Sequence, residues 1–174
     1  MKKSVWVYGL IMGFVLSAFT VISVGMCYQS SDFGGNEVLG YSVMLVVFSL
    51  VFVAIRNHRN NFREGTISFG EAFKMGLSIV LIASTLYVVT WLVYYKFFIP
   101  DFMDRYADYS LRTAKENGAT PEQLATQTKD MQGFIEMYKN PLFTILMSYA
   151  EIVPVGLVVS LLSALILKKK KIAA

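Results

Sequence analysis

The chain has 174 residues and a formal net charge of +4 at pH 7, and 55% of its residues are hydrophobic. This apolar content argues against an ordinary soluble domain. The single cysteine, Cys27, excludes an internal disulfide.

Four apolar blocks dominate the sequence, at residues 5–27, 38–55, 75–99 and 142–167. A hydrocarbon layer of ~30 Å is crossed by a helix of about 20 apolar residues, so each block predicts one transmembrane helix. We therefore expect an all-α polytopic membrane protein that forms a single membrane domain over residues 1–174.

Basic residues gather in three stretches that flank these blocks. The three stretches contain Lys2, Lys3, Arg56, Arg59, Arg63, Lys74 and Lys168–Lys171. Lysine and arginine favour the cytoplasmic side of a membrane. All three stretches share one side only if the chain crosses four times, so we expect both termini in the cytoplasm. A lysine run directly after an apolar span is typical of an anchor at anionic headgroups rather than of a nucleic-acid contact.

The first block predicts an uncleaved helix, because no small-x-small cleavage site precedes Tyr28. Its Gly9 and Gly13 have the spacing of a close helix–helix contact. Glycine is also frequent in membrane helices in general, so the spacing alone does not decide between these two interpretations.

The second block ends in a polar stretch, residues 56–61, that contains the single histidine, His58. With no second histidine and no cysteine nearby, His58 predicts no metal site. We expect it to lie in a solvated loop.

The third helix is predicted to begin at a capping box formed by Ser68 and Glu71 and to end before Pro100. A helix over residues 69–99 would be ~46 Å long at 1.5 Å per residue. It would therefore exceed the hydrocarbon layer at both ends.

Residues 101–140 predict two helices that form an amphipathic hairpin outside the membrane. Phe102, Tyr106 and Tyr109 lie on one side of the first helix, and Gly118 ends it. Thr120 and Pro121 begin the second. That helix carries an apolar stripe of Leu124, Thr128, Met131, Ile135 and Tyr138. The stripes are expected to pack on each other, on the bilayer surface, or on a protein partner.

Glu151 is the one carboxylate within a predicted span, and ionisable residues in that position are often functional. Pro154 cannot bond the carbonyl of Ala150, and Gly156 adds local freedom. These residues predict a polar notch that either pairs with Lys96 or accepts a hydrogen bond from Ser84, Thr85 or Thr90, or that binds a cation or relays a proton. A position near the interface with no special role is the third interpretation.

Motifs of known enzymes are missing from the sequence: it contains no HExxH, CxxC, P-loop, GxSxG or dinucleotide fingerprint. We therefore expect no catalytic residues and no cofactor.

The runs GTISFGEAFKMGLSIVLIAS, YVVTWLVYYKFFIPDFMDRY and MYKNPLFTILMSYAEIVPVGLVVSLLSALILKKK resemble a bacterial membrane family catalogued as domain of unknown function 4199. The resemblance covers nearly the whole chain and implies a small four-span inner-membrane protein, common in Bacteroidota. It implies no activity, ligand or site.

The sequence favours a non-enzymatic scaffold, assembly factor or small subunit that acts through helix packing and through the hairpin at 101–140. Its partners would be the lipid bilayer, a second membrane protein or further copies of itself. The alternative is a small oligomeric ion- or proton-coupled transporter or channel that uses Glu151 near Pro154.

Overall fold

The computed structural model describes residues 1–30, 32–34 and 37–169 and contains six helices in this part of the chain. The helices are α1 (Lys2–Ser30), α2 (Glu37–Phe62), α3 (Phe69–Phe97), α4 (Phe102–Glu116), α5 (Pro121–Tyr138) and α6 (Pro141–Leu167). The all-α prediction is confirmed, and so are the four long apolar helices, because α1, α2, α3 and α6 are each long and apolar enough to cross a membrane.

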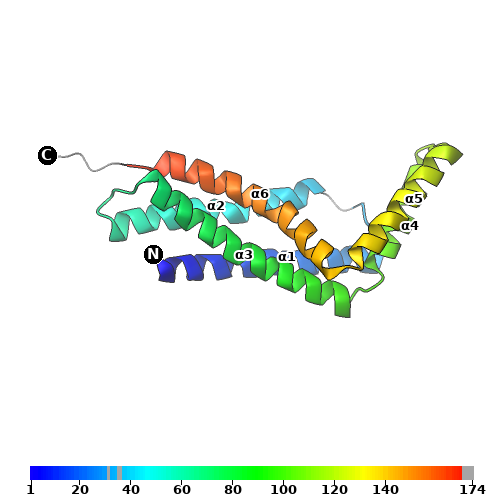
Figure 1. Cartoon of the computed structure of the whole chain (residues 1–174), viewed down its shortest axis with the longest axis horizontal. Coiled ribbons are helices and arrows are strands. Elements are labelled where there is room, and N and C mark those ends of the chain that lie inside the picture. The colour runs from blue at the N-terminus through cyan, green and yellow to red at the C-terminus, as the bar shows by residue number, and fades with distance from the viewer. Residues whose placement is uncertain (31, 35–36, 170–174) are drawn as a thin grey trace.

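The four long helices form a bundle in which α1 and α3 run in one direction and α2 and α6 run in the other (Figure 1). Helix α3 packs chiefly against α1 and α6, and α2 packs chiefly against α6 and α1. The order around the bundle is therefore α1, α3, α6, α2. Since α6 packs on α3 although the hairpin separates them in sequence, the hairpin is an insertion between two neighbours of the bundle.

Apolar side chains fill the inside of the bundle and also cover its outside. Phe48, Met12 and Ile79 are fully buried. On the outer surface Phe14 is 70% exposed, Val46 68% and Ile166 69%. A soluble protein rarely exposes such a continuous apolar surface, so this distribution fits a bundle surrounded by lipid.

Small residues allow the helices to approach closely. A Cβ atom on Gly9 would lie 2.8 Å from Ile82 Cβ, and one on Gly13 would lie 3.0 Å from the carbonyl oxygen of Ala83. The glycine spacing of the first helix therefore serves the contact between α1 and α3 within the chain. Membrane helices usually pack through close approach at small residues. The hydrophobic effect does not drive their association within the bilayer, so van der Waals contact must do so.

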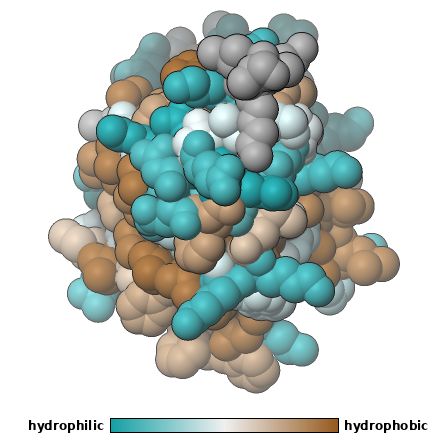
Figure 2. All heavy atoms as spheres, turned by 90° about the vertical axis from the view of Figure 1, so that its left-hand side faces the viewer, coloured by the Kyte–Doolittle hydropathy of each residue, from teal (hydrophilic) through white to brown (hydrophobic). Residues whose placement is uncertain are grey.

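The three predicted basic stretches meet at one end of the bundle, which we call the basic end. Figure 1 places the start of α1, the end of α6 and the connection from α2 to α3 there. The described basic residues at this end are Lys2, Lys3, Arg56, Arg59, Arg63, Lys74, Lys168 and Lys169. Figure 2 shows this end covered by hydrophilic side chains, with hydrophobic ones along the sides of the bundle. Lys170 and Lys171 lie outside the described residues.

Helix α2 continues past the predicted end of the second span and includes His58. The expectation that His58 is solvated is wrong: the residue is only 4% exposed, and its ring stacks on Phe62 at 5.5 Å between centroids. Neither ring nitrogen has a hydrogen-bond partner among the residues that the structure describes. The polar sequence around His58 suggested a loop, whereas one side of the continued helix turns this ring inward.

Helix α3 begins as predicted at Ser68, whose hydroxyl accepts a hydrogen bond from the Glu71 amide at 3.2 Å. The Glu71 carboxylate pairs with Arg63, which differs from the predicted bond back to the Ser68 amide. A guanidinium attracts a carboxylate more strongly than a neutral amide does, and the loop from α2 brings Arg63 within reach.

The predicted hairpin is present as α4 and α5, which lie side by side and extend away from the bundle at an angle (Figure 1). Thr120 and Gln123 form the predicted capping box, with both reciprocal bonds. Met103 and Ala107 of α4 are buried, whereas no residue of α5 is fully buried. We call the end of the bundle that carries α4 and α5 the hairpin end.

Candidate functional site

Glu151 lies close to the middle of α6. The helix has 27 residues centred on Pro154, so Glu151 is about 4.5 Å from the centre, on the side of the hairpin end. The side chain is exposed in the isolated chain, although its neighbour Ile152 is fully buried. Among the described residues no ion pair or hydrogen bond engages the Glu151 carboxylate. The carboxyl group is therefore placed deep in the membrane-spanning part of the chain without a partner among the described residues.

The hydroxyl groups that the sequence offered to Glu151 are engaged elsewhere or turned away. The Thr85 hydroxyl bonds to the Tyr149 hydroxyl at 2.8 Å and also donates to the Leu81 carbonyl. Ser84 is fully buried, and its hydroxyl has no partner. Tyr138, at the end of α5, is close enough to be affected by the carboxylate: burial raises its pKa first, and the charge of Glu151 raises it further.

Pro154 and Gly156 lie on different sides of α6. Pro154 is exposed, like Glu151 three residues before it, and residues three apart share one side of a helix. Gly156 is buried, and a Cβ atom there would lie 2.4 Å from Val80 Cγ1 and 3.2 Å from Phe48 Cζ. Gly156 thus brings α6 against α3 and α2, while Glu151 and Pro154 together form the outward-facing polar position.

Lys96 is not paired with Glu151. Its ammonium lies 5.8 Å from the centroid of the Phe97 ring, and its side chain lines a cavity of about 460 Å³ between α3, α5 and α6. The other lining residues are Leu92, Tyr95, Pro100, Tyr138, Lys139, Pro141 and Thr144. The same cavity is therefore lined by Lys96 and by Lys139, which follows α5 where the hairpin returns to the bundle.

Sequence reasoning missed this cavity because its walls come from segments far apart in the chain. The aromatic residues at the end of the third span were visible in the sequence, but the return of Tyr138 and Lys139 to the same place depends on the angle of the hairpin. The Asn140–Pro141 start of α6, with the Asn140 side chain accepting from the Leu142 amide at 3.0 Å, fixes that return.

A second group missed in the sequence holds the base of the hairpin to α1. The Tyr28 hydroxyl donates to Asp101, and Arg105 Nε donates to Asp101 Oδ2 at 2.7 Å. The Arg105 guanidinium lies over the Tyr28 ring, 4.2 Å from its centroid. The hydrogen bond from Tyr28, and then that from Arg105, hold the pKa of Asp101 below its ordinary value of 3.8. The Asp101–Arg105 spacing is readable in sequence, but Tyr28, 73 residues away, is not.

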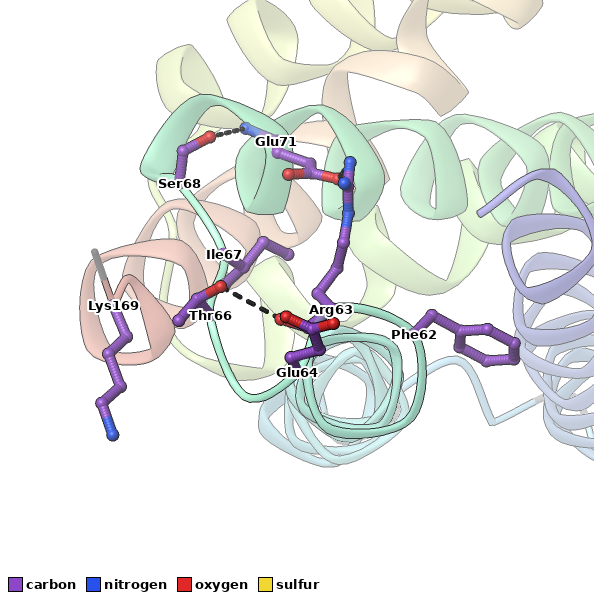
Figure 3. Close-up of a pocket in the computed structure, with 8 residues that line it drawn as sticks. All are labelled: Phe62, Arg63, Glu64, Thr66, Ile67, Ser68, Glu71 and Lys169. Carbon is purple, nitrogen blue, oxygen red and sulfur yellow. Dashed lines mark hydrogen bonds and ion pairs between the residues drawn. The ribbon is translucent and has the colours of Figure 1, made fainter. Parts of the chain in front are cut away.

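A further cavity of about 450 Å³ opens at the basic end (Figure 3). Its walls are the connection from α2 to α3 and the end of α6, which are joined by two backbone hydrogen bonds between Ile67 and Lys169. Figure 3 shows Arg63 and Glu71 turned toward each other. Two cationic and two acidic side chains line it, so its charges balance. This balance gives it no preference for an anion or a cation.

In the described part of the chain, no three histidine, cysteine, aspartate or glutamate side chains lie close enough together to hold a metal ion. The titratable groups are instead distributed along the bundle: His58 near the basic end, Glu151 near the middle, and the Asp101 group at the hairpin end.

Comparison with known proteins gives one match. A family model described as "Protein of unknown function (DUF4199)" matches residues 7–169. No curated protein and no solved structure matches the chain. Since the family model covers all four long helices and the hairpin, the chain belongs to the DUF4199 family of proteins of unknown function.

Proposed function

We propose that this protein is a non-enzymatic subunit or assembly factor of a membrane complex, and that it binds its partner through the Glu151 side of α6 and through the α4–α5 hairpin. The observation that carries the proposal is the Glu151 carboxylate, exposed near the middle of a membrane-spanning helix with no partner among the described residues.

A charged side chain at the centre of a transmembrane helix costs about 3 kcal/mol on insertion scales, and a neutral carboxyl group without a hydrogen-bond partner is also costly in lipid. In the described part of this chain no side chain bonds to the Glu151 carboxyl group to offset that cost. A donor supplied by a neighbouring membrane protein would remove it, which makes this side of α6 a natural contact between subunits.

The orientation follows from the charge distribution. Lysines and arginines favour the cytoplasmic side of a membrane, which supports an orientation with the basic end in the cytoplasm. Both termini then face the cytoplasm of a bacterial cell, the protein lies in the inner membrane, and the hairpin projects from the outer face.

The hairpin offers a protein surface rather than a lipid anchor. A helix that lies in a bilayer surface needs an exposed apolar side. Among the large hydrophobic side chains of the hairpin only Tyr106 and Met137 are exposed, at 36% and 47%. Its exposed positions otherwise carry mixed charges, such as Asp108, Arg112 and Lys129. This surface suits a polar protein partner outside the membrane.

Photo-crosslinking in cells tests the proposal. A photoreactive residue replaces Met147 or Val158, which share the Glu151 side of α6, or Lys129 on the hairpin. Phe14, 70% exposed on α1, is the control position for contacts with lipid. We expect one foreign membrane protein to be captured from α6 and the same complex to be captured from the hairpin. Capture of lipid alone at Met147 and Val158, as at Phe14, would contradict the proposal.

The exposed Glu151 also favours a second function, an oligomeric ion- or proton-coupled transporter or channel. Pro154 has no amide hydrogen, which leaves the Ala150 carbonyl free one residue before Glu151. Glu151→Gln separates the two functions, because glutamine keeps the shape and the hydrogen bonds but does not titrate. Loss of proton or cation flux from vesicles containing a folded Glu151→Gln protein would favour transport. Unchanged assembly in that variant would favour the subunit.

A further inference from the structure

The cavity between α3, α5 and α6 brings together two cations that the sequence keeps 43 residues apart. Lys96 comes from the last turn of α3 and Lys139 from the C-cap of α5. Tyr95 and Tyr138 line the same cavity, with their rings in edge contact at 5.9 Å. At about 460 Å³ the cavity lies within the usual size of small-ligand sites.

The charge of this cavity is not neutralised from within. Among the described residues Lys96 has no ion-pair partner. Lys139 pairs with Glu136, but the two side chains are 64% and 68% exposed, and ion pairs so exposed contribute little and exchange readily. The carboxylates of Asp104, Glu136 and Glu151 interact electrostatically with Tyr95, Lys139 and Tyr138 respectively. None of these three carboxylates lines the cavity. The lining of the cavity therefore includes two lysines and two tyrosines, and no carboxylate.

The position of the cavity at the level of the lipid headgroups favours an amphiphilic anion over a soluble one. Lys96 lies at the end of a span and Pro141 at the start of the next, which is the level of lipid headgroups when the four helices cross the bilayer. Below the lysines the wall is apolar, formed by Leu92 and the rings of Tyr95 and Tyr138. A soluble anion would use only the charged rim, whereas an amphiphile would use both parts.

We propose that this cavity binds the phosphate headgroup of an anionic phospholipid, with the phosphate between Lys96 and Lys139 and the glycerol and upper acyl chain against Leu92 and Tyr95. This inference does not depend on the proposed subunit function. It would place one specific lipid under the hairpin, where it would link α5 to the ends of α3 and α6.

The test uses the full-length protein in phosphatidylcholine vesicles with a small fraction of spin-labelled phosphatidylglycerol or spin-labelled phosphatidylcholine. The immobilised fraction of each gives the preference for the anionic lipid. Lys96→Gln/Lys139→Gln removes both cations. Lys115→Gln/Lys129→Gln is the matched control, because it removes the same amount of charge from exposed positions of the hairpin that do not line the cavity. Lys96→Arg/Lys139→Arg keeps the charge, and Lys96→Gln alone tests the site if the double variant does not fold.

We expect the preference for phosphatidylglycerol to fall at least about threefold in Lys96→Gln/Lys139→Gln, as expected for two partly solvated charge contacts, and to be kept in the arginine variant and in the control. An unchanged preference in the glutamine variants would overturn the proposal. An equal fall in Lys115→Gln/Lys129→Gln would overturn it in favour of diffuse attraction. Displacement of the labelled lipid by inorganic phosphate would overturn the lipid assignment in favour of a soluble phosphate.

Discussion

At Gly156 α6 approaches α3 and α2 closely, and the replacement of this residue by alanine tests the packing of the bundle. The added Cβ atom would lie 2.4 and 2.8 Å from the two methyl carbons of Val80 and 3.2 Å from Phe48 Cζ. Val80 and Phe48 are both 0% exposed, so the added atom enters a buried contact. At these distances either the Val80 side chain or the two helices must shift.

The matched control is Gly40→Ala in α2, where nothing lies within 4 Å of the added atom. Both substitutions gain the same helix propensity, about 1 kcal/mol at most, so the difference between them reports packing alone. Inserting a methyl group into a filled core costs about 1–3 kcal/mol. We expect Gly156→Ala to be less stable than Gly40→Ala by that amount. Val80→Ala should recover part of the loss in the double variant.

The free energy of unfolding is measured in mixed micelles with a rising fraction of dodecyl sulfate, followed by far-ultraviolet circular dichroism. Equal stability of Gly156→Ala and Gly40→Ala would refute the close approach of α6 to α3. A loss in Gly156→Ala that Val80→Ala does not reduce would place the conflict at another neighbour.

Three further predictions concern single groups. Asp101 has a depressed pKa in the folded protein, so its contribution to holding the hairpin is present above its ordinary pKa of 3.8 and is lost as the pH falls through the lower folded value. Asp101→Asn should abolish this acid-dependent part of the melting curve, and an unchanged pH profile would contradict the assignment. Thr120→Ala should cost about 1 kcal/mol by removing the cap of α5, seen as faster amide hydrogen exchange in the first turn of that helix but not in α3. His58→Phe should leave the free energy of unfolding equal or higher, because two buried nitrogens without partners are replaced by a ring that still stacks on Phe62. A loss above about 1 kcal/mol would reveal a hidden partner for the imidazole.

The fold could be predicted from sequence wherever one local pattern dominates. Apolar block length gave the four long helices, and the caps at Ser68 and Thr120 gave the starts of α3 and α5. The location of the basic residues predicted that both termini share one end. These features depend on residues within a few positions of each other, so no knowledge of the three-dimensional packing was needed.

The contacts between distant segments could not be predicted. Polar sequence around His58 indicated a loop, but the side of α2 that faces inward depends on how α2 packs. The charge of Lys96 made it a natural partner for Glu151. In the structure Lys96 instead lines a cavity together with Lys139, because of the angle of the hairpin. Gly156 was taken as a source of freedom, whereas the neighbouring Val80 makes it a position of close contact.

The native mass of the complex, extracted from cells with its surrounding lipid by an amphipathic polymer, shows whether the chain is a subunit of a larger assembly. We expect a particle that contains a different membrane protein in fixed ratio to the 19.6 kDa chain and that separates when Glu151 is replaced by leucine. A particle with one copy of the chain and lipid alone would contradict it. A particle of several identical copies would contradict it in favour of an oligomeric transporter.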